Sequence, residues 1–131
     1  ARQIISQVIC YMDKRTEMAL LLDLYGELLT DKQRLVLDQY YNYDLSLQEI
    51  ADNVGISKQG VYDILKRSEH TLSETEEKLK LLEKLGRIRA ALEKTRDKLV
   101  LIRDRTDNEE GDMLDTAILE IGDLVNNLIG G

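Results

Sequence analysis

Apolar residues spaced three and four apart predict two short helices between residues 47 and 66. In the first helix, Ile50 and Val54 form an inward face, and Ala51 is small enough for another helix to cross closely. Gly55 follows, and glycine readily takes the left-handed conformation of a tight turn. The second helix repeats the apolar spacing at Val61, Ile64 and Leu65. This pattern predicts a helix-turn-helix.

Polar residues at the predicted helix starts support the same interpretation. Ser46 and Glu49 have the spacing of a capping box for the first helix, and Ser57 is a good N-cap for the second. A helix capped in this way presents its first turn to a partner. The outward positions of the second helix are Lys58, Gln59, Tyr62, Asp63 and Lys66.

Two further helices are predicted upstream. The first covers residues 17–29, with Thr16 as its N-cap. The second starts at a capping box formed by Thr30 and Gln33. The first helix places Met18, Leu21, Leu22, Tyr25, Leu28 and Leu29 on one face, and the second has apolar positions at Leu35, Leu37, Tyr40 and Tyr41.

Downstream, the spacing changes to that of long helices. A heptad seam runs from residue 81 to 102, and after a polar break a second seam runs from 114 to 128. Such seams need a covering surface, which is either the other helix of the same chain in a hairpin or a second copy in a coiled-coil dimer. Two seams in one small chain favour a homodimer. The seam residues are Leu81, Leu85, Ile88, Leu92, Thr95, Leu99 and Ile102, then Leu114, Ile118, Ile121, Val125 and Leu128.

The composition agrees with an all-α protein, because the 131 residues include no Pro, Trp or Phe. Cys10 is the only cysteine and His70 is the only histidine, so no disulfide framework, metal site or Cys-His nucleophile is expected. We expect neither a cofactor nor enzymatic activity. No apolar run reaches the length of a membrane span, and a cytoplasmic protein is the expected class.

Charge is distributed unevenly along a chain whose net charge is −7. Residues 78–105 carry ten basic and four acidic side chains, whereas residues 106–123 carry seven acidic and no basic ones. The two segments therefore attract each other as complementary helices. A second interpretation is that the basic segment also binds nucleic-acid phosphates. The residues of this secondary basic surface are Arg87, Arg89, Lys94 and Arg96.

The stretch TDKQRLVLDQYYNYDLSLQEIADNVGISKQGVYDILKRSEHTL resembles the YlxM family of small bacterial helix-turn-helix proteins, and is more distantly similar to region four of sigma factors. The resemblance covers roughly residues 17–80. It implies a nucleic-acid-binding surface on the second helix, with DNA favoured over RNA, and a role in the signal recognition particle pathway, with a component of that particle as a partner. With the adjacent Arg67, the binding residues are Ser57, Lys58, Gln59, Tyr62, Lys66 and Arg67.

These observations define three parts of the chain. Residues 12–71 form the helix-turn-helix domain, and residues 72–131 form the long basic helix and the acidic C-terminal helix. The family resemblance places the natural start near Met12, so residues 1–11 are interpreted as an upstream-start leader or as non-native sequence. The expected function is that of a nucleic-acid-binding regulatory protein. The alternative is a protein-interaction adaptor that uses the motif as a scaffold, which the net charge of −7 favours.

Overall fold

The computed structural model describes residues 12–106 and 109–128, so the interpretation of residues 1–11 lies outside the described part. Within these ranges the chain forms six α-helices and one 3-10 turn, without a β-strand, which confirms the all-α prediction. None of the helices in these ranges has the length and apolarity needed to cross a membrane. The chain divides into two compact units, one ending at Leu82 and one beginning at Glu83.

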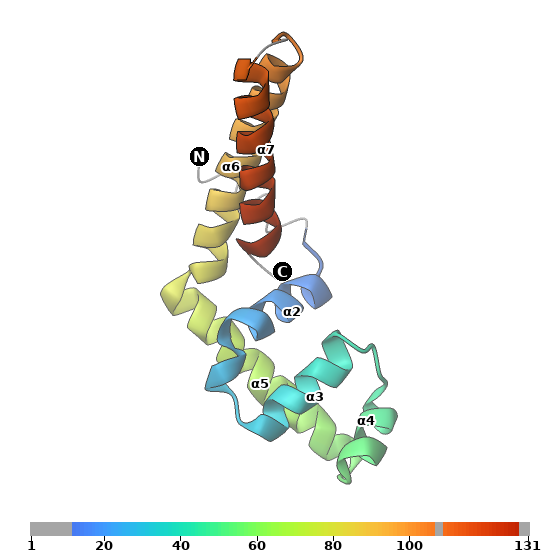
Figure 1. Ribbon diagram of the computed structural model, residues 1–131. Helices are drawn as coiled ribbons and strands as arrows, with labels where there is room; N and C mark the ends of the chain where they lie inside the picture. Colours follow the sequence, from blue (N-terminus) through green and yellow to red (C-terminus); the bar gives the residue numbers. More distant parts are fainter. Residues whose placement is uncertain (1–11, 107–108, 129–131) are drawn as a thin grey trace. The chain divides into compact units, whose positions relative to one another are not determined.

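The first unit is built around one long helix. Helix α5 contacts each of α2, α3 and α4, and all four are visible in Figure 1. Its core consists of apolar side chains from all four helices, including the fully buried Leu21, Leu37, Ile50 and Leu72. Residue 71, the predicted end of the motif domain, lies inside α5. The elements are α2 (Lys14–Tyr25), η1 (Gly26–Leu28), α3 (Asp31–Tyr41), α4 (Leu47–Val54) and α5 (Lys58–Leu79).

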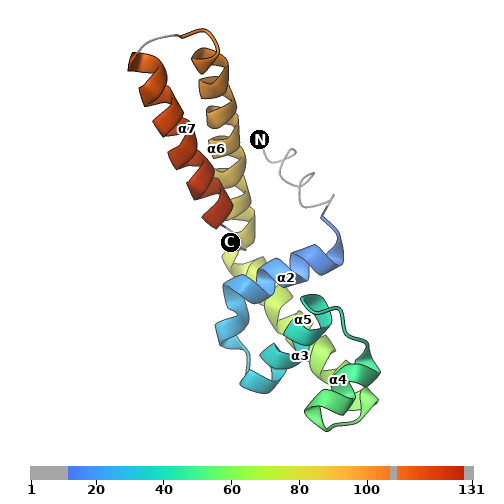
Figure 2. The same cartoon turned by 45° about the vertical axis from the view of Figure 1, so that its right-hand side comes forward.

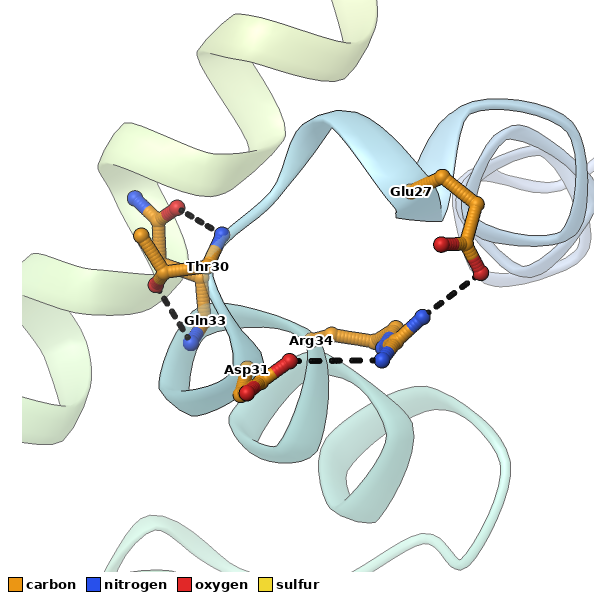
Figure 3. Close-up of polar contacts among 5 residues, drawn as sticks. All are labelled: Glu27, Thr30, Asp31, Gln33 and Arg34. Carbon is orange, nitrogen blue, oxygen red and sulfur yellow. Dashed lines mark hydrogen bonds and ion pairs between the residues drawn. The ribbon is translucent and has the colours of Figure 1, made fainter.

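Helix α3 begins at the predicted capping box, which the structure confirms. The Thr30 hydroxyl accepts a hydrogen bond from the Gln33 amide at 3.2 Å, and the Gln33 side chain accepts one from the Thr30 amide at 3.0 Å (Figure 3). Arg34 lies beside this cap and pairs with Glu27 at 2.8 Å and with Asp31 at 3.4 Å. These contacts fix the join between η1 and α3.

The predicted start of the first upstream helix is wrong. Helix α2 begins at Lys14, and its N-cap is Asp13, whose carboxylate accepts a hydrogen bond from the Thr16 amide at 2.7 Å. An aspartate caps a helix as well as a threonine does, and the earlier start adds a turn. Thr16 is therefore the third residue of the helix rather than its cap.

Two predicted core positions are also wrong. Leu28 is 63% exposed and Leu35 is 47% exposed. Leu28 is exposed because the α-helix ends at Tyr25 and the 3-10 turn that follows changes the direction of the side chains. On α3 the inward face includes Val36, which is fully buried, and this rotates Leu35 outward.

The second unit is a helical hairpin. Helix α6 (Leu81–Arg103) extends into it from the end of the first unit, and α7 (Glu109–Leu128) returns antiparallel to it. The two helices lie side by side in both views (Figures 1 and 2). Near the turn, Arg103 Nε lies 2.8 Å from a carboxylate oxygen of Asp115. This arrangement confirms the hairpin, with a basic helix against an acidic one.

The predicted seam of α6 faces α7 only in part. Leu85, Leu92 and Leu99 are half-buried, but Ile88 and Ile102 are 48% and 51% exposed. The other half-buried positions of α6 include Arg89, Arg96 and Arg103, which shows that the inward face is rotated away from Ile88. In contrast, all five predicted seam residues of α7 are buried or half-buried.

Candidate nucleic-acid interface

The turn between α4 and α5 has the geometry that the sequence predicts. Gly55 adopts a left-handed conformation with φ of 73°, and its amide donates to the Ala51 carbonyl at 2.9 Å. The Ile56 amide donates to the same carbonyl at 3.2 Å. Two hydrogen bonds therefore close α4 before the chain reverses direction, and they set the angle at which α5 departs.

Both helices of the motif are capped as predicted. Ser46 and Glu49 form a complete capping box at the start of α4. Ser57 caps α5, because its hydroxyl accepts a hydrogen bond from the Gly60 amide at 3.0 Å. Ser57 is itself exposed, so the first turn of α5 is both ordered and accessible. A helix N-terminus carries partial positive charge, which suits a phosphate contact.

Close packing of α4 against α5 directs one face of α5 inward. Ile50 and Val61 are fully buried, and Ala51 and Leu65 are 3% exposed. The motif therefore has a shared apolar core, as predicted. The opposite face of α5 is left for contact with a partner.

The first turns of α4 and α5 border a shallow groove. Its volume is about 430 Å³, and its lining consists of Leu47, Lys58, Gln59 and Tyr62. Tyr62 is 45% exposed and lines the groove together with Lys58 and Gln59. The groove thus combines a cation, an amide and a ring, which are the groups that contact phosphates and base edges.

Two of the predicted binding residues engage acidic neighbours. The Lys66 ammonium lies 3.4 Å from the carboxylate of Glu69 and 5.5 Å from the centre of the Tyr62 ring. The Gln59 amide donates to the Asp63 carboxylate at 3.0 Å. Asp63 lies on the outward face beside these residues, so the surface is not uniformly positive.

Lys58 and Arg67 are the least constrained cations of the motif. Both are exposed, and within residues 12–106 and 109–128 neither forms an ion pair. Arg67 lies nine residues beyond Lys58 in the same helix, which is about two and a half turns. All six predicted binding residues are therefore on or next to one exposed helix, although they differ in how freely their side chains can move.

The four residues of the predicted secondary surface are divided between two sides of α6. Arg87 and Lys94 are exposed, whereas Arg89 and Arg96 are half-buried. Three of the four also lie near a carboxylate, with Arg87 at 2.7 Å from Glu83, Arg89 at 3.2 Å from Glu93 and Arg96 at 3.9 Å from Asp97. The structure does not bring these four side chains together on one face.

A buried polar cluster lies behind α5, the second helix of the motif and hereafter the recognition helix, and sequence reasoning missed it. Glu69 is 8% exposed, and its carboxylate accepts a hydrogen bond from the Tyr41 hydroxyl. Lys14 and Lys66 each place an ammonium nitrogen 3.4 Å from the same carboxylate. The available signal was the position of Glu69, which shares the apolar face of Leu65 and Leu72.

Burial opposes ionisation of Glu69, but its neighbours outweigh that effect. The hydrogen bond from Tyr41 and the two lysines lower the pKa of Glu69 below its usual value. Tyr41 responds in the opposite direction, because burial and the adjacent Glu69 carboxylate raise its pKa. The cluster therefore holds a carboxylate and a neutral phenol at neutral pH. It is suited to fixing α5 on α3.

Comparisons with known proteins agree with this architecture. Residues 12–111 match the family model described as "Putative helix-turn-helix protein, YlxM / p13 like". A UPF0122 protein of Clostridium kluyveri is 57% identical over 72 residues, a match that spans 55% of this chain and 65% of that protein. A UPF0122 protein of Thermoanaerobacter is 47% identical over 93 residues, covering 71% of this chain and 80% of the relative. A UPF0122 protein of Bacillus pumilus is 42% identical over 103 residues, covering 79% of this chain and 91% of the relative.

The family match includes the whole first unit described here, from α2 to α5, and continues through α6. It thus covers the capped turn, the exposed face of α5 and the buried cluster behind it. The chain belongs to the YlxM/p13-like helix-turn-helix family, also called UPF0122.

Proposed function

We propose that this protein is a non-enzymatic regulator that binds nucleic acid, with DNA preferred over RNA, through the N-terminal half of α5. The observation that carries the proposal is the groove at the first turn of α5, where Lys58, Gln59 and Tyr62 are exposed together. A capped helix that projects such side chains is suited to a major groove.

The small number of cations sets the expected strength of binding. The motif offers Lys58, Lys66 and Arg67, and Lys66 already has an acidic partner. Each neutralised phosphate contributes about −0.9 to the slope of log affinity against log salt, so three contacts give a slope of roughly −3. One copy would therefore bind weakly. A homodimer would double the contacts, and we propose that state for the working protein.

The setting of the proposed activity follows from the resemblance to the YlxM family. It suggests a regulatory role in the signal recognition particle pathway, with a component of that particle as a partner, in the cytoplasm. The proposal of a regulator rests on the side chains exposed together at the first turns of α5. In the described ranges no group of His, Cys, Asp and Glu is arranged to hold a metal ion.

A second candidate function is that of a protein-interaction adaptor. It is favoured by a groove of about 600 Å³ on α2, η1 and α3, lined by four carboxylates, by Leu35 and by Arg34, which pairs with two of those carboxylates. This groove is suited to a basic segment of a partner protein, since its lining carries four acidic side chains and one basic side chain. The carboxylates belong to Asp23, Glu27, Asp31 and Asp38.

Fluorescence anisotropy separates the two candidates. The full chain is titrated against a labelled duplex DNA and a labelled RNA hairpin at several salt concentrations. The proposed regulator binds the duplex more tightly than the hairpin, and its affinity falls as salt rises. Binding of neither at low salt would reject the proposal and favour the adaptor.

A further inference from the structure

Helix α6 carries an apolar stripe that α7 does not cover. Ile88, Thr95 and Ile102 recur at seven-residue intervals, so they lie along one side of the helix, and all three are exposed. A second stripe lies on α7, where Met113 is 74% exposed and Leu124 is 57% exposed. These two are eleven residues apart, or about three turns, and therefore share a side as well.

Both stripes lie on the same flank of the hairpin. With 3.6 residues per turn, each stripe is displaced from its helix's inward face by about a quarter turn. When each helix is viewed from its own N-terminus, the stripe of α6 and the stripe of α7 are rotated away from their inward faces in the same rotational direction. Because α6 and α7 run antiparallel, equal displacements bring the two stripes to one flank. We name this apolar flank the stripe flank, defined by Ile88, Thr95, Ile102, Met113 and Leu124.

We propose that the stripe flank binds the stripe flank of a second copy of this chain, so that two hairpins form a four-helix bundle. The first argument is continuity with the existing interface. Leu85, Leu92 and Leu99, which are half-buried on the hairpin side, alternate along α6 with the exposed stripe residues. The heptad seam is thus one surface, half covered by α7 and half exposed. An apolar surface of this kind marks an interaction site.

The second argument is charge, which also selects the arrangement. Helix α6 has seven basic and three acidic residues, whereas α7 has six acidic and no basic ones. A two-fold axis parallel to the helices places α6 of each copy against α7 of the other, antiparallel to it. The axis perpendicular to the helices would place like-charged helices together. Charge complementarity therefore favours the parallel axis.

The same arrangement predicts one specific pair between copies. Lys98 lies five residues before Arg103, and Glu120 lies five residues after Asp115, the partner of Arg103. Lys98 and Glu120 are therefore at the same level of the hairpin. With the parallel axis, Lys98 of one copy faces Glu120 of the other. Glu120 and Leu124 also line a groove of about 430 Å³, which has room for a lysine side chain.

This inference deepens the homodimer that forms part of the proposed function. It is tested by the mass of the protein alone, so its failure is distinguishable from failure to bind nucleic acid. Sedimentation equilibrium of the full chain is measured across a range of concentrations. The wild type is expected to be a dimer, and the variant Ile88→Asp with Ile102→Asp is expected to be a monomer.

The opposite flank supplies a matched control. Leu101 and Leu119 are 61% and 69% exposed and are displaced from the inward faces in the opposite sense. Leu101→Asp with Leu119→Asp should leave the dimer intact. A wild type that stays monomeric at the highest concentration, or equal loss of dimer in both variants, would overturn the proposal.

A charge exchange tests the arrangement without changing any apolar residue. Lys98→Glu and Glu120→Lys should each weaken dimerisation about tenfold, because each places like charges opposite one another. The two changes together in one chain should restore the wild-type dissociation constant to within about threefold. A double variant whose dissociation constant does not return toward the wild-type value would contradict the parallel axis. The charge exchange remains informative even if the aspartate variant fails to fold.

Discussion

The hydroxyl of Tyr41 at the end of α3 donates a hydrogen bond to the buried carboxylate of Glu69 in α5. This contact joins the helix before the motif to the middle of the recognition helix. Two lysine ammonium groups, from Lys14 and Lys66, satisfy the other carboxylate oxygen. The position of α5 thus depends on one polar cluster as well as on apolar packing.

Replacing Tyr41 by Phe should destabilise the first unit by about 1 to 3 kcal/mol, since it removes a donor from a buried carboxylate. Urea denaturation followed by circular dichroism measures the change. Tyr43→Phe is the matched control, because Tyr43 is 68% exposed and its replacement should change the stability to urea only slightly. Equal stability of the Tyr41 and Tyr43 variants would show that the hydrogen bond does not stabilise the fold.

A second phenol–carboxylate pair makes stability sensitive to alkaline pH. Tyr25 donates to Glu76 at 2.6 Å, while the Leu82 amide donates to the same carboxylate oxygen at 3.1 Å. Burial, and then the bond to Glu76, raise the pKa of Tyr25 from 10.0 to about 12. The native state therefore retains a proton that the unfolded state loses above pH 10. The stabilisation that this pair contributes is therefore fully present below pH 10, and it is lost as the pH rises toward about 12.

Ionisation of Tyr25 at alkaline pH is expected to lower the free energy of unfolding by roughly 1 to 3 kcal/mol, since one unit of pKa corresponds to about 1.4 kcal/mol. Urea midpoints measured between about pH 9 and 11.5 should fall less steeply for Tyr25→Phe than for the wild type. The control is again Tyr43→Phe, which should keep the wild-type slope. Parallel pH profiles for the wild type and the Tyr25 variant would contradict the assignment.

The crossing of α4 over α5 leaves no space for a larger side chain at Ala51, which is 3% exposed. Ala51→Leu should therefore cost about 1 to 3 kcal/mol through overpacking. Ala90→Leu makes the same change at an exposed position of α6 and should alter stability by less than about 0.5 kcal/mol. Differential scanning calorimetry compares the two. Identical transitions would mean that the helices do not pack closely at Ala51.

Local signals made the helix-turn-helix predictable from the sequence. The caps at Thr30, Ser46 and Ser57 and the left-handed Gly55 depend on neighbours within a few residues, and all four are confirmed. The exposed face of α5 follows from helical spacing once the buried face is known. The apolar spacing of α7 also identified its inward face correctly.

Features that depend on tertiary packing were not predictable in the same way. The seam of α6 was placed by apolar spacing alone, but its half-buried positions also include Arg89, Arg96 and Arg103, and Arg103 pairs with Asp115 of the acidic helix. Arginine can bury its stem while its charged end meets a carboxylate, as Arg103 does at Asp115, so apolar spacing alone does not define this face. The Tyr41–Glu69 contact joins positions 28 residues apart, and spacing along one helix cannot reveal its partner.

The four basic residues of the secondary surface on α6 are divided between an exposed side and a half-buried side of the helix. Arg87 and Lys94 are exposed, so they can contact a polyanion, whereas Arg89 and Arg96 are half-buried. Arg87 and Lys94 are thus the appropriate pair for comparison with the recognition helix. They belong to the second unit, whereas the residues that hold α5 in place belong to the first.

The central claim is that the recognition helix meets the phosphates, and the salt dependence of duplex DNA binding tests it most directly. Lys58→Gln with Arg67→Gln removes two exposed cations without leaving an acidic partner unpaired in the described part of the chain. This variant should bind more weakly and lose about two units of salt slope. The matched pair Arg87→Gln with Lys94→Gln should keep the wild-type affinity and slope. The reverse outcome, with binding lost in the α6 pair and kept in the α5 pair, would contradict the account.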